Sequence, residues 1–224
     1  MTINQGDFVQ LSYTGRVTET NAVFDTTDRT VAEKNNVAQK NKTYGPVTIC
    51  LGEGQIIQGL DESVVGKNES DEYTVTIPPE KAFGKKDAKL VRLISMSKFK
   101  EQNVQPKPNL TVYINEKMGF IKTVSGGRVL VDFNHPFSGK TLTYDVIIDK
   151  HVTDLAEKVK AVLALGKFDD ASVEVTNDTA IITFKNPIPE TMTKVIETHV
   201  QHLIKDIKKV EFTIPKDFEA AKNK

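Results

Sequence analysis

The sequence predicts an α+β protein with three successive regions, and three observations carry this prediction. Residues 1 to about 85 contain short runs of β-branched and aromatic residues, separated by glycine and proline turns. The next region, to about residue 134, is rich in strand-forming residues and basic. The last region, from residue 154, alternates between helical and strand periodicity. The 224 residues, 38% of them hydrophobic, suffice for more than one compact unit.

The first region predicts strands around one short helix. Three runs have strand patterns: residues 8–13, 47–51 and 73–77. We expect a turn at Thr14-Gly15 and a helix over residues 58–66, where apolar residues share one face. Polar residues 28–43 indicate a surface loop, with a short helix as the alternative.

The middle region predicts a small, mainly β unit. Three further runs have strand patterns: residues 110–115, 118–124 and 128–133. Ser125-Gly126-Gly127 joins the last two as a hairpin, and residues 95–102 predict one or two helical turns.

The last region predicts the order α-β-β-α-β. Asp154 and Glu157 have the spacing of a capping box that begins the first helix, and Asn177-Asp178 predicts a turn between two strands. The second helix has a broad apolar stripe: Met192, Val195, Ile196, His199, Val200, Leu203, Ile204 and Ile207. We expect a small core of its own here. Because the stripe exceeds what three strands cover, we also expect a homodimer or docking on another protein.

Charge and cysteine content exclude several classes of protein. Thirty basic and thirty acidic residues cancel, which excludes a uniformly basic nucleic-acid coat. The balance is uneven, since residues 1–84 hold 7 basic and 12 acidic residues and residues 85–135 hold 10 and 4. No apolar run approaches the roughly 18 residues of a membrane span. One cysteine, Cys50, forms no internal disulfide. We therefore expect a cytoplasmic protein without nucleic-acid or membrane partners.

No motif predicts a cofactor or a metal. Ser138-Gly139-Lys140-Thr141 ends like a phosphate-binding loop, but Asn134 stands where that motif needs glycine. His199 and His202 are three residues apart on a helix, without a third ligand near them in sequence. We expect neither nucleotide, metal nor cofactor, and no hydrolytic triad is visible.

Five short strings occur in a characteristic order. They are Tyr13-Thr14-Gly15, Val23-Phe24-Asp25, Gln55-Ile56-Ile57-Gln58-Gly59-Leu60, Ala82-Phe83-Gly84 and Leu142-Thr143-Tyr144-Asp145-Val146. In this order they resemble FKBP-type peptidyl-prolyl cis-trans isomerases. The insertion of about fifty residues after Gly84 is similar to the insert-in-flap domain of the SlyD-like branch. Residues 28–43 and the C-terminal region are similar to long archaeal-type members.

The resemblance implies a particular domain organisation. An antiparallel FKBP half-barrel sheet around a short helix would form a discontinuous catalytic domain from residues 1–85 and 135–153. Residues 86–134 would be an inserted, mainly β flap domain with chaperone activity. Residues 154–224 would be a small C-terminal α+β domain.

Rotation about an Xaa-Pro bond breaks amide resonance, a barrier of roughly 18–20 kcal/mol for peptide bonds, without breaking a covalent bond. A nucleophile or proton-transfer pair is therefore not required. Because the planar amide is the more charge-separated form, a dry apolar pocket favours the twisted transition state. A few donors suffice to hold the flanking carbonyl.

The resemblance assigns residues to such a pocket. Its catalytic lining would be Tyr13, Phe24, Asp25, Ile56, Ile57, Leu60, Phe83 and Tyr144, with Ile49 as a further substrate contact. The Ile57 backbone N–H would hold a substrate carbonyl, and Tyr13 would orient Asp25. Phe83 replaces the usual tyrosine. If the lost hydroxyl bond strengthens in the transition state, its absence lowers the rate by about tenfold at most.

The basic middle region offers apolar side chains for holding unfolded chains. They are Ile94, Met96, Phe99, Met118 and Phe120. The alternative is that these side chains form the region's own core. The expected partners are unfolded or partly folded polypeptides with Xaa-Pro bonds. A second function stays open, a holdase or assembly module on the same fold with weak or no catalysis.

Overall fold

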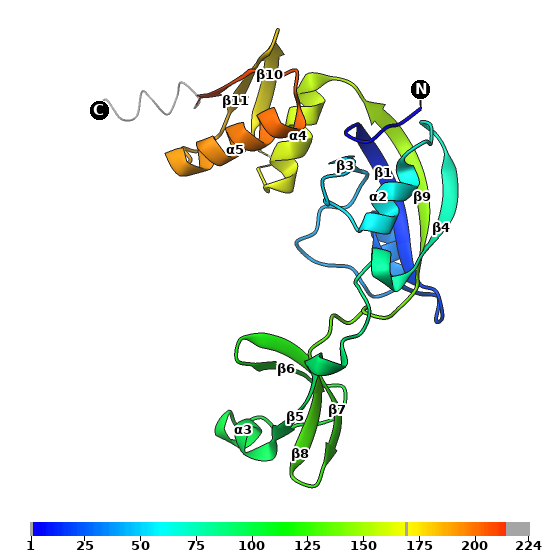
Figure 1. Cartoon of the computed structure of the whole chain (residues 1–224). Helices are drawn as coiled ribbons and strands as arrows, with labels where there is room; N and C mark the ends of the chain where they lie inside the picture. Colours follow the sequence, from blue (N-terminus) through cyan, green and yellow to red (C-terminus); the bar gives the residue numbers. More distant parts are fainter. Residues whose placement is uncertain (1, 169, 214–224) are drawn as a thin grey trace, which may run out of the picture. The chain divides into compact units, whose positions relative to one another are not determined.

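The computed structural model describes residues 2–168 and 170–213, which divide into two compact units (Figure 1). The first unit comprises residues 1–76 and 143–224, and the second comprises residues 77–142. The α+β class with antiparallel sheets is confirmed. In the part of the chain that is described, no helix is both long and apolar enough to span a membrane.

The N-terminal part of the first unit is a five-stranded sheet. Its strands are β1 (Phe8–Val17), β2 (Ala22–Thr26), β3 (Val47–Cys50), β4 (Glu72–Ile77) and β9 (Leu142–Val152). The order is β2-β1-β9-β4, and β3 also pairs with β1. Phe8–Leu11 pair with β3, while Thr14–Val17 pair with β2. β1 therefore connects two short strands.

Two expectations for this part were wrong. β1 continues to Val17 without a turn at Thr14-Gly15. Instead, the pairing register of β1 with β2 shifts between Gly15 and Arg16. Residues 28–43 contain helix α1 (Arg29–Lys34), so the favoured loop is wrong there and the short-helix alternative is confirmed. The Asp28 side chain accepts a hydrogen bond from the Val31 N–H, which satisfies an otherwise unpaired donor of the first turn. Ala32 is buried and anchors the helix.

Helix α2 (Gln58–Val64) covers the predicted helical segment. Its buried side chains, among them Leu60 and Val64, lie four residues apart and therefore on one face. Asp61 on the same helix is also buried, and its carboxylate accepts from the Gly52 N–H at 2.9 Å.

From Leu155 onward the elements are α4 (Leu155–Leu165), β10 (Ser172–Thr176), β11 (Thr179–Thr183), α5 (Glu190–Leu203) and β12 (Lys209–Thr213). The sheet order is β10-β11-β12, with β10 antiparallel and β12 parallel to β11. Asp154 caps α4 by accepting from the Glu157 N–H at 2.8 Å, which confirms the predicted helix start. The end of the chain, residues 214–224, lies outside the described residues.

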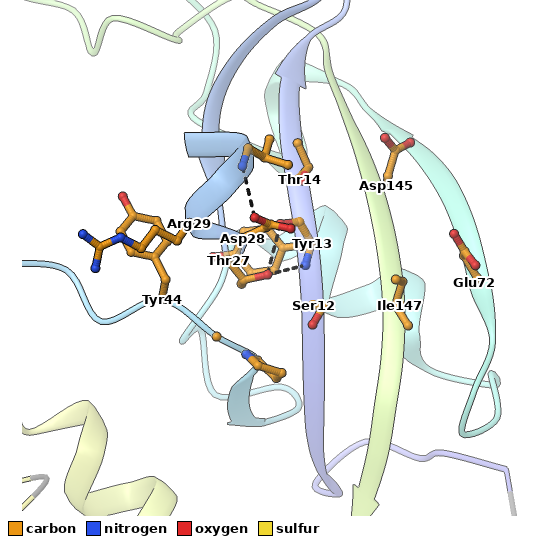
Figure 2. A pocket seen from close by; sticks show the side chains of 13 residues that line it. Ser12, Tyr13, Thr14, Thr27, Asp28, Arg29, Tyr44, Glu72, Asp145 and Ile147 are labelled. Atoms are coloured by element: carbon orange, nitrogen blue, oxygen red, sulfur yellow. Dashed lines mark hydrogen bonds between the residues drawn. The ribbon is translucent and has the colours of Figure 1, made fainter. Parts of the chain in front are cut away.

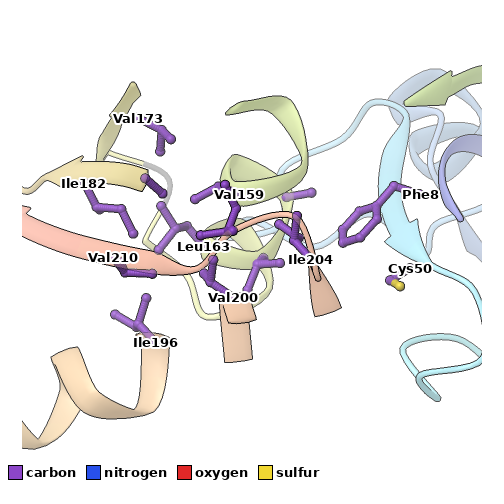
Figure 3. Packing of buried hydrophobic residues seen from close by; sticks show 14 of the residues in the cluster. Phe8, Cys50, Val159, Leu163, Val173, Ile182, Ile196, Val200, Ile204 and Val210 are labelled. Carbon is purple, nitrogen blue, oxygen red and sulfur yellow. The ribbon is translucent and has the colours of Figure 1, made fainter. Parts of the chain in front are cut away.

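The C-terminal part has a hydrophobic core that also includes side chains of the first sheet. One hydrophobic cluster contains Val159, Val200 and Val210 together with Phe8 of β1 and Cys50 of β3 (Figure 3). The α4 lysine Lys158 also lies over the Phe8 ring, 5.7 Å from its centroid. The expected core is therefore present, and Phe8 and Cys50 of the first sheet extend it.

The second unit has its own sheet and core. Its sheet order is β5-β8-β7-β6, formed by β5 (Val91–Ser95), β6 (Thr111–Ile114), β7 (Lys117–Ser125) and β8 (Arg128–Asp132). Two 3₁₀ turns, η1 (Pro79–Lys81) and η2 (Ala88–Leu90), precede it, and α3 (Met96–Glu101) follows β5. The core contains Phe99, Val112, Ile114, Ile121, Val129 and Val131.

Candidate functional site

Four of the predicted site residues come together on β1, β2 and β9. The Tyr13 Oη donates to Asp25 Oδ2 at 3.1 Å. The Tyr144 ring stands edge-on to both Tyr13 and Phe24, with centroid distances of 5.7 and 5.9 Å. The site is thus a cluster of aromatic rings with one carboxylate at its edge.

Gly15 makes this cluster possible. A Cβ at Gly15 would lie 2.8 Å from Tyr144 Cε1 and 3.1 Å from Phe24 Cζ. Both distances are shorter than ordinary van der Waals contact. Gly15, which the sequence analysis assigned to a turn, is therefore needed because aromatic rings from β2 and β9 approach the backbone of β1 too closely for a side chain at this position.

Lys42 is a site residue that the sequence analysis missed. Its Nζ lies 2.6 Å from Asp25 Oδ1 and donates to the Thr26 carbonyl at 3.2 Å. Asp25 consequently has a neutral donor on one oxygen and a cation on the other. No local sequence signal indicates this pair, because Lys42 lies in a polar segment 17 residues after Asp25.

The two tyrosines are neutral donors throughout the physiological pH range. Burial raises the pKa of Tyr13, and the charge and hydrogen bond of Asp25 raise it further. Burial also raises the pKa of Tyr144, with smaller contributions from Asp25 and Tyr13. The cluster therefore offers apolar rings and two phenol hydroxyls that keep their protons, of which that of Tyr13 is hydrogen-bonded to Asp25.

The four aliphatic site candidates differ in exposure. Ile49 and Leu60 are buried, whereas Ile56 and Ile57 are half-buried. Ile57 is the residue before α2, and among the described residues its backbone N–H donates no hydrogen bond. That N–H is thus available to a ligand. The inclusion of these four in one pocket with Tyr144 stays a prediction.

Phe83 belongs to the second unit. Its ring stacks on His135 with a centroid distance of 4.3 Å, and Phe137 lies 5.6 Å away. The Ser138 Oγ donates to the Phe83 carbonyl at 2.9 Å. Burial lowers the pKa of His135, which favours its uncharged form in this stack. The assignment of Phe83 to the pocket of the first unit also stays a prediction.

A cavity of about 540 Å³ lies next to the cluster (Figure 2). Its lining includes Tyr13, together with Ser12, Arg29, Tyr44 and Ile147. None of the other predicted catalytic residues lines it. This cavity is therefore not the predicted proline pocket.

The residues predicted to hold unfolded chains occupy different parts of the second unit. Phe99 is only 2% exposed and belongs to the core, so its assignment to a binding surface was wrong. Ile94 and Met96 pack against that core from its edge. Met118 is 44% exposed and Phe120 is half-buried.

The sheet register places Met118 and Phe120 on the face opposite the core. Met118 pairs with Tyr113, and Leu93 pairs with Leu130. Since side chains alternate along a strand, one face carries the core and the other carries an exposed apolar set. We call this set the outer sheet face: Leu93, Tyr113, Met118, Phe120 and Leu130. The sequence analysis missed Leu93 and Tyr113, which are 59% and 65% exposed.

Comparison with known proteins shows the family of the chain. A family model described as FKBP26, IF domain, matches residues 92–137. A short-type peptidyl-prolyl cis-trans isomerase of Methanocaldococcus jannaschii is 32% identical over 144 residues, covering 64% of this chain and 90% of that protein. The chain belongs to the FKBP-type peptidyl-prolyl cis-trans isomerase family.

Two bacterial members of the FKBP-type family show the same relationship. The protein named "Probable FKBP-type 16 kDa peptidyl-prolyl cis-trans isomerase" of Pseudomonas fluorescens is 38% identical over 123 residues, 52% of this chain and 81% of its own length. The SlyD isomerase of Treponema pallidum is 26% identical over 126 residues, 52% of this chain and 68% of its own length. The SlyD-like resemblance is thereby confirmed.

Proposed function

We propose that this FKBP-type chain rotates Xaa-Pro bonds of polypeptides in a pocket built around Tyr13, Phe24, Asp25 and Tyr144. The observation that carries the proposal is the cluster itself, in which Phe24 and Tyr144 pack against Gly15 and Tyr13 joins Tyr144 to Asp25, in a chain of this family. Ile49, Ile56, Ile57 and Leu60 would complete the apolar wall.

In this mechanism the protein supplies an environment and no reacting group. The rings of Phe24 and Tyr144 would exclude water from the proline, which favours the less charge-separated twisted amide. The Ile57 N–H, which has no partner within the described chain, would hold the flanking carbonyl. Tyr13 and Lys42 fix Asp25 from both sides, so its carboxylate is oriented before a substrate binds.

We also propose that the second unit holds unfolded clients on its outer sheet face. Leu93, Tyr113 and Met118 are exposed there, and methionine adapts to varied apolar partners. In domain terms, residues 86–134 would be the chaperone domain inserted into a catalytic domain of residues 1–85 and 135–153. Residues 154–224 would be a third domain.

A holdase without useful catalysis is the second candidate. The observation that favours it is Phe83, whose ring has no hydroxyl and stacks on His135. The two candidates differ in their action on a short peptide, which is too small to need a client-holding surface.

The test is the NMR exchange rate between the cis and trans forms of a short Ala-Leu-Pro-Phe peptide, measured with the full chain. Acceleration is the expected result. A chain that suppresses aggregation of an unfolded protein without accelerating this exchange would support the holdase and refute the isomerase proposal.

A further inference from the structure

A large groove lies in the first unit, between the segment after α1 and helix α4. Its volume is about 1310 Å³. One wall is residues 39–48, and the floor includes Gln10, Lys150 and Val152. The other wall is one face of α4, because its lining residues recur at helical spacing: Glu157, Lys160, Ala161, Ala164 and Leu165.

This groove is strongly basic although the whole chain is neutral. Five lysines line it, Lys40, Lys42, Lys150, Lys160 and Lys167, against one acidic residue, Glu157. Lys150 pairs with Glu157 at 2.6 Å, and Lys42 pairs with Asp25. Within the described residues, the other three have no ion-pair partner. The three unpaired lysines leave an excess of positive charge in the groove, and a concave surface with such an excess attracts anionic ligands.

The apolar part of the groove indicates which kind of anion fits. Leu165 is 49% exposed, and Ala161, Ala164, Pro46 and Val47 also contribute to the lining. The lining has one aromatic side chain, Tyr44. Sites for single-stranded nucleic acid usually stack successive bases on several aromatic rings. An aliphatic lining with lysines suits a polypeptide whose carboxylates alternate with aliphatic side chains.

We propose that this groove binds acidic segments of polypeptide chains that contain aliphatic residues. The groove shares Lys42 with the aromatic cluster, and none of its other lining residues belongs to that cluster. Binding there requires no proline in the ligand. The proposal therefore goes beyond isomerisation and gives the chain a preference among polypeptides.

The direct test is fluorescence anisotropy of the full chain with a fluorescein-labelled peptide of alternating Glu and Leu. The comparison probe has Gln in place of every Glu. We expect the acidic peptide to bind at least about tenfold more tightly, because several exposed ion pairs each contribute a small amount. Equal binding of both peptides would overturn the proposal.

Charge reversal locates the site. Lys160→Glu with Lys167→Glu should weaken binding of the acidic peptide about tenfold, since two attractions become repulsions. The matched control, Lys185→Glu with Lys205→Glu, makes the same change of charge at exposed positions outside the groove. The control should retain binding. An equal loss in both variants would show general electrostatic attraction and refute a site in the groove.

Two further measurements test whether the lysines themselves bind the peptide and whether the groove prefers polypeptide over DNA. Lys160→Gln with Lys167→Gln tests the same side chains without adding negative charge, should the reversed variant fail to fold, and a loss of severalfold is expected. A DNA oligonucleotide of equal charge should compete less well than unlabelled acidic peptide, and equal competition would contradict a polypeptide site. Because the probes lack proline, these outcomes are independent of isomerase activity.

Discussion

At the scale of single residues, Asp25 is the most constrained group of the aromatic cluster. Tyr13 donates to one of its oxygens and Lys42 contacts the other. The pKa of Tyr13 is raised by burial and by Asp25, so the phenol keeps its proton at any physiological pH. The hydrogen bond is therefore a permanent positioning contact for the carboxylate.

Tyr13→Phe tests that positioning. The ring is retained, so we expect folding to be little affected. The peptide isomerisation rate should fall by about tenfold or less, the value of one hydrogen bond to a partly exposed charge. The rate is measured by NMR exchange on the proline peptide, and the melting temperature serves as the control. An unchanged rate would show that the orientation of Asp25 by Tyr13 does not matter.

Asp145 gives a pH-dependent prediction. The hydrogen bond from Arg16 lowers the pKa of this carboxyl below its ordinary value of 3.8, and one from Thr74 adds to the effect. A lowered folded-state pKa means that the ionised form stabilises the fold above pH 3.8 and that this contribution is lost as the pH falls through the folded pKa.

Asp145→Asn should therefore flatten the acid side of the stability curve. Because the carboxylate is 46% exposed, the loss at neutral pH should not exceed about 1 kcal/mol. Thermal unfolding across acid pH checks this, with Asp206→Ala as an exposed control. An unaltered acid slope in Asp145→Asn would contradict the assigned cause.

At the scale of elements, the sheet of the second unit has two apolar faces. Val129 and Val131 of β8 lie in the core, whereas Leu130 between them points to the outer sheet face. Exposure of Leu93, Tyr113 and Met118 has no packing purpose within the described unit. The proposed client binding would give this exposure a function.

Leu93→Glu with Met118→Glu should reduce suppression of aggregation several-fold, because two apolar contacts are replaced by charges. Isomerisation of the short peptide should be affected much less. Light scattering of an unfolding client measures the first effect. Gln102→Glu with Gln105→Glu adds the same charge at exposed positions of the same unit as a control. Equal effects in both variants would argue against the outer sheet face.

The elements that the sequence predicted correctly have local signals. The Asp154 cap, the hairpin at Gly126-Gly127 and the turn at Asn177 each depend on a few adjacent residues. The errors depend on distant residues. Gly15 is required by rings of β2 and β9, and Lys42 meets Asp25 only in the folded chain.

At the scale of the whole molecule, residues of one apolar stripe in the sequence differ in how far the fold buries them. The α5 stripe predicts one continuous apolar face, yet Ile196 and Val200 are buried while Met192 and Val195 are 42% and 55% exposed. The three-stranded sheet, Phe8 and Cys50 cover only part of the stripe. The sequence therefore predicts the apolar stripe of α5 but not which of its residues are buried.

The exposed part of α5 predicts a homodimer. Sedimentation of the full chain should show a concentration-dependent dimer, and Val195→Glu should shift the equilibrium to the monomer by introducing charge into the apolar contact. Asn186→Glu, which adds the same single charge at an exposed position outside α5, is the control. A full chain that sediments as a monomer at every concentration would refute the dimer.

The central claim is that the aromatic cluster around Asp25 catalyses rotation of Xaa-Pro bonds. The most direct measurement compares NMR exchange rates of the proline peptide with the full chain, with Asp25→Ala and with the control Asp206→Ala. We expect strong acceleration by the full chain and the control, and a clear loss with Asp25→Ala while the melting curve stays cooperative. Acceleration of equal size in all three proteins would place the catalysis elsewhere and contradict the account.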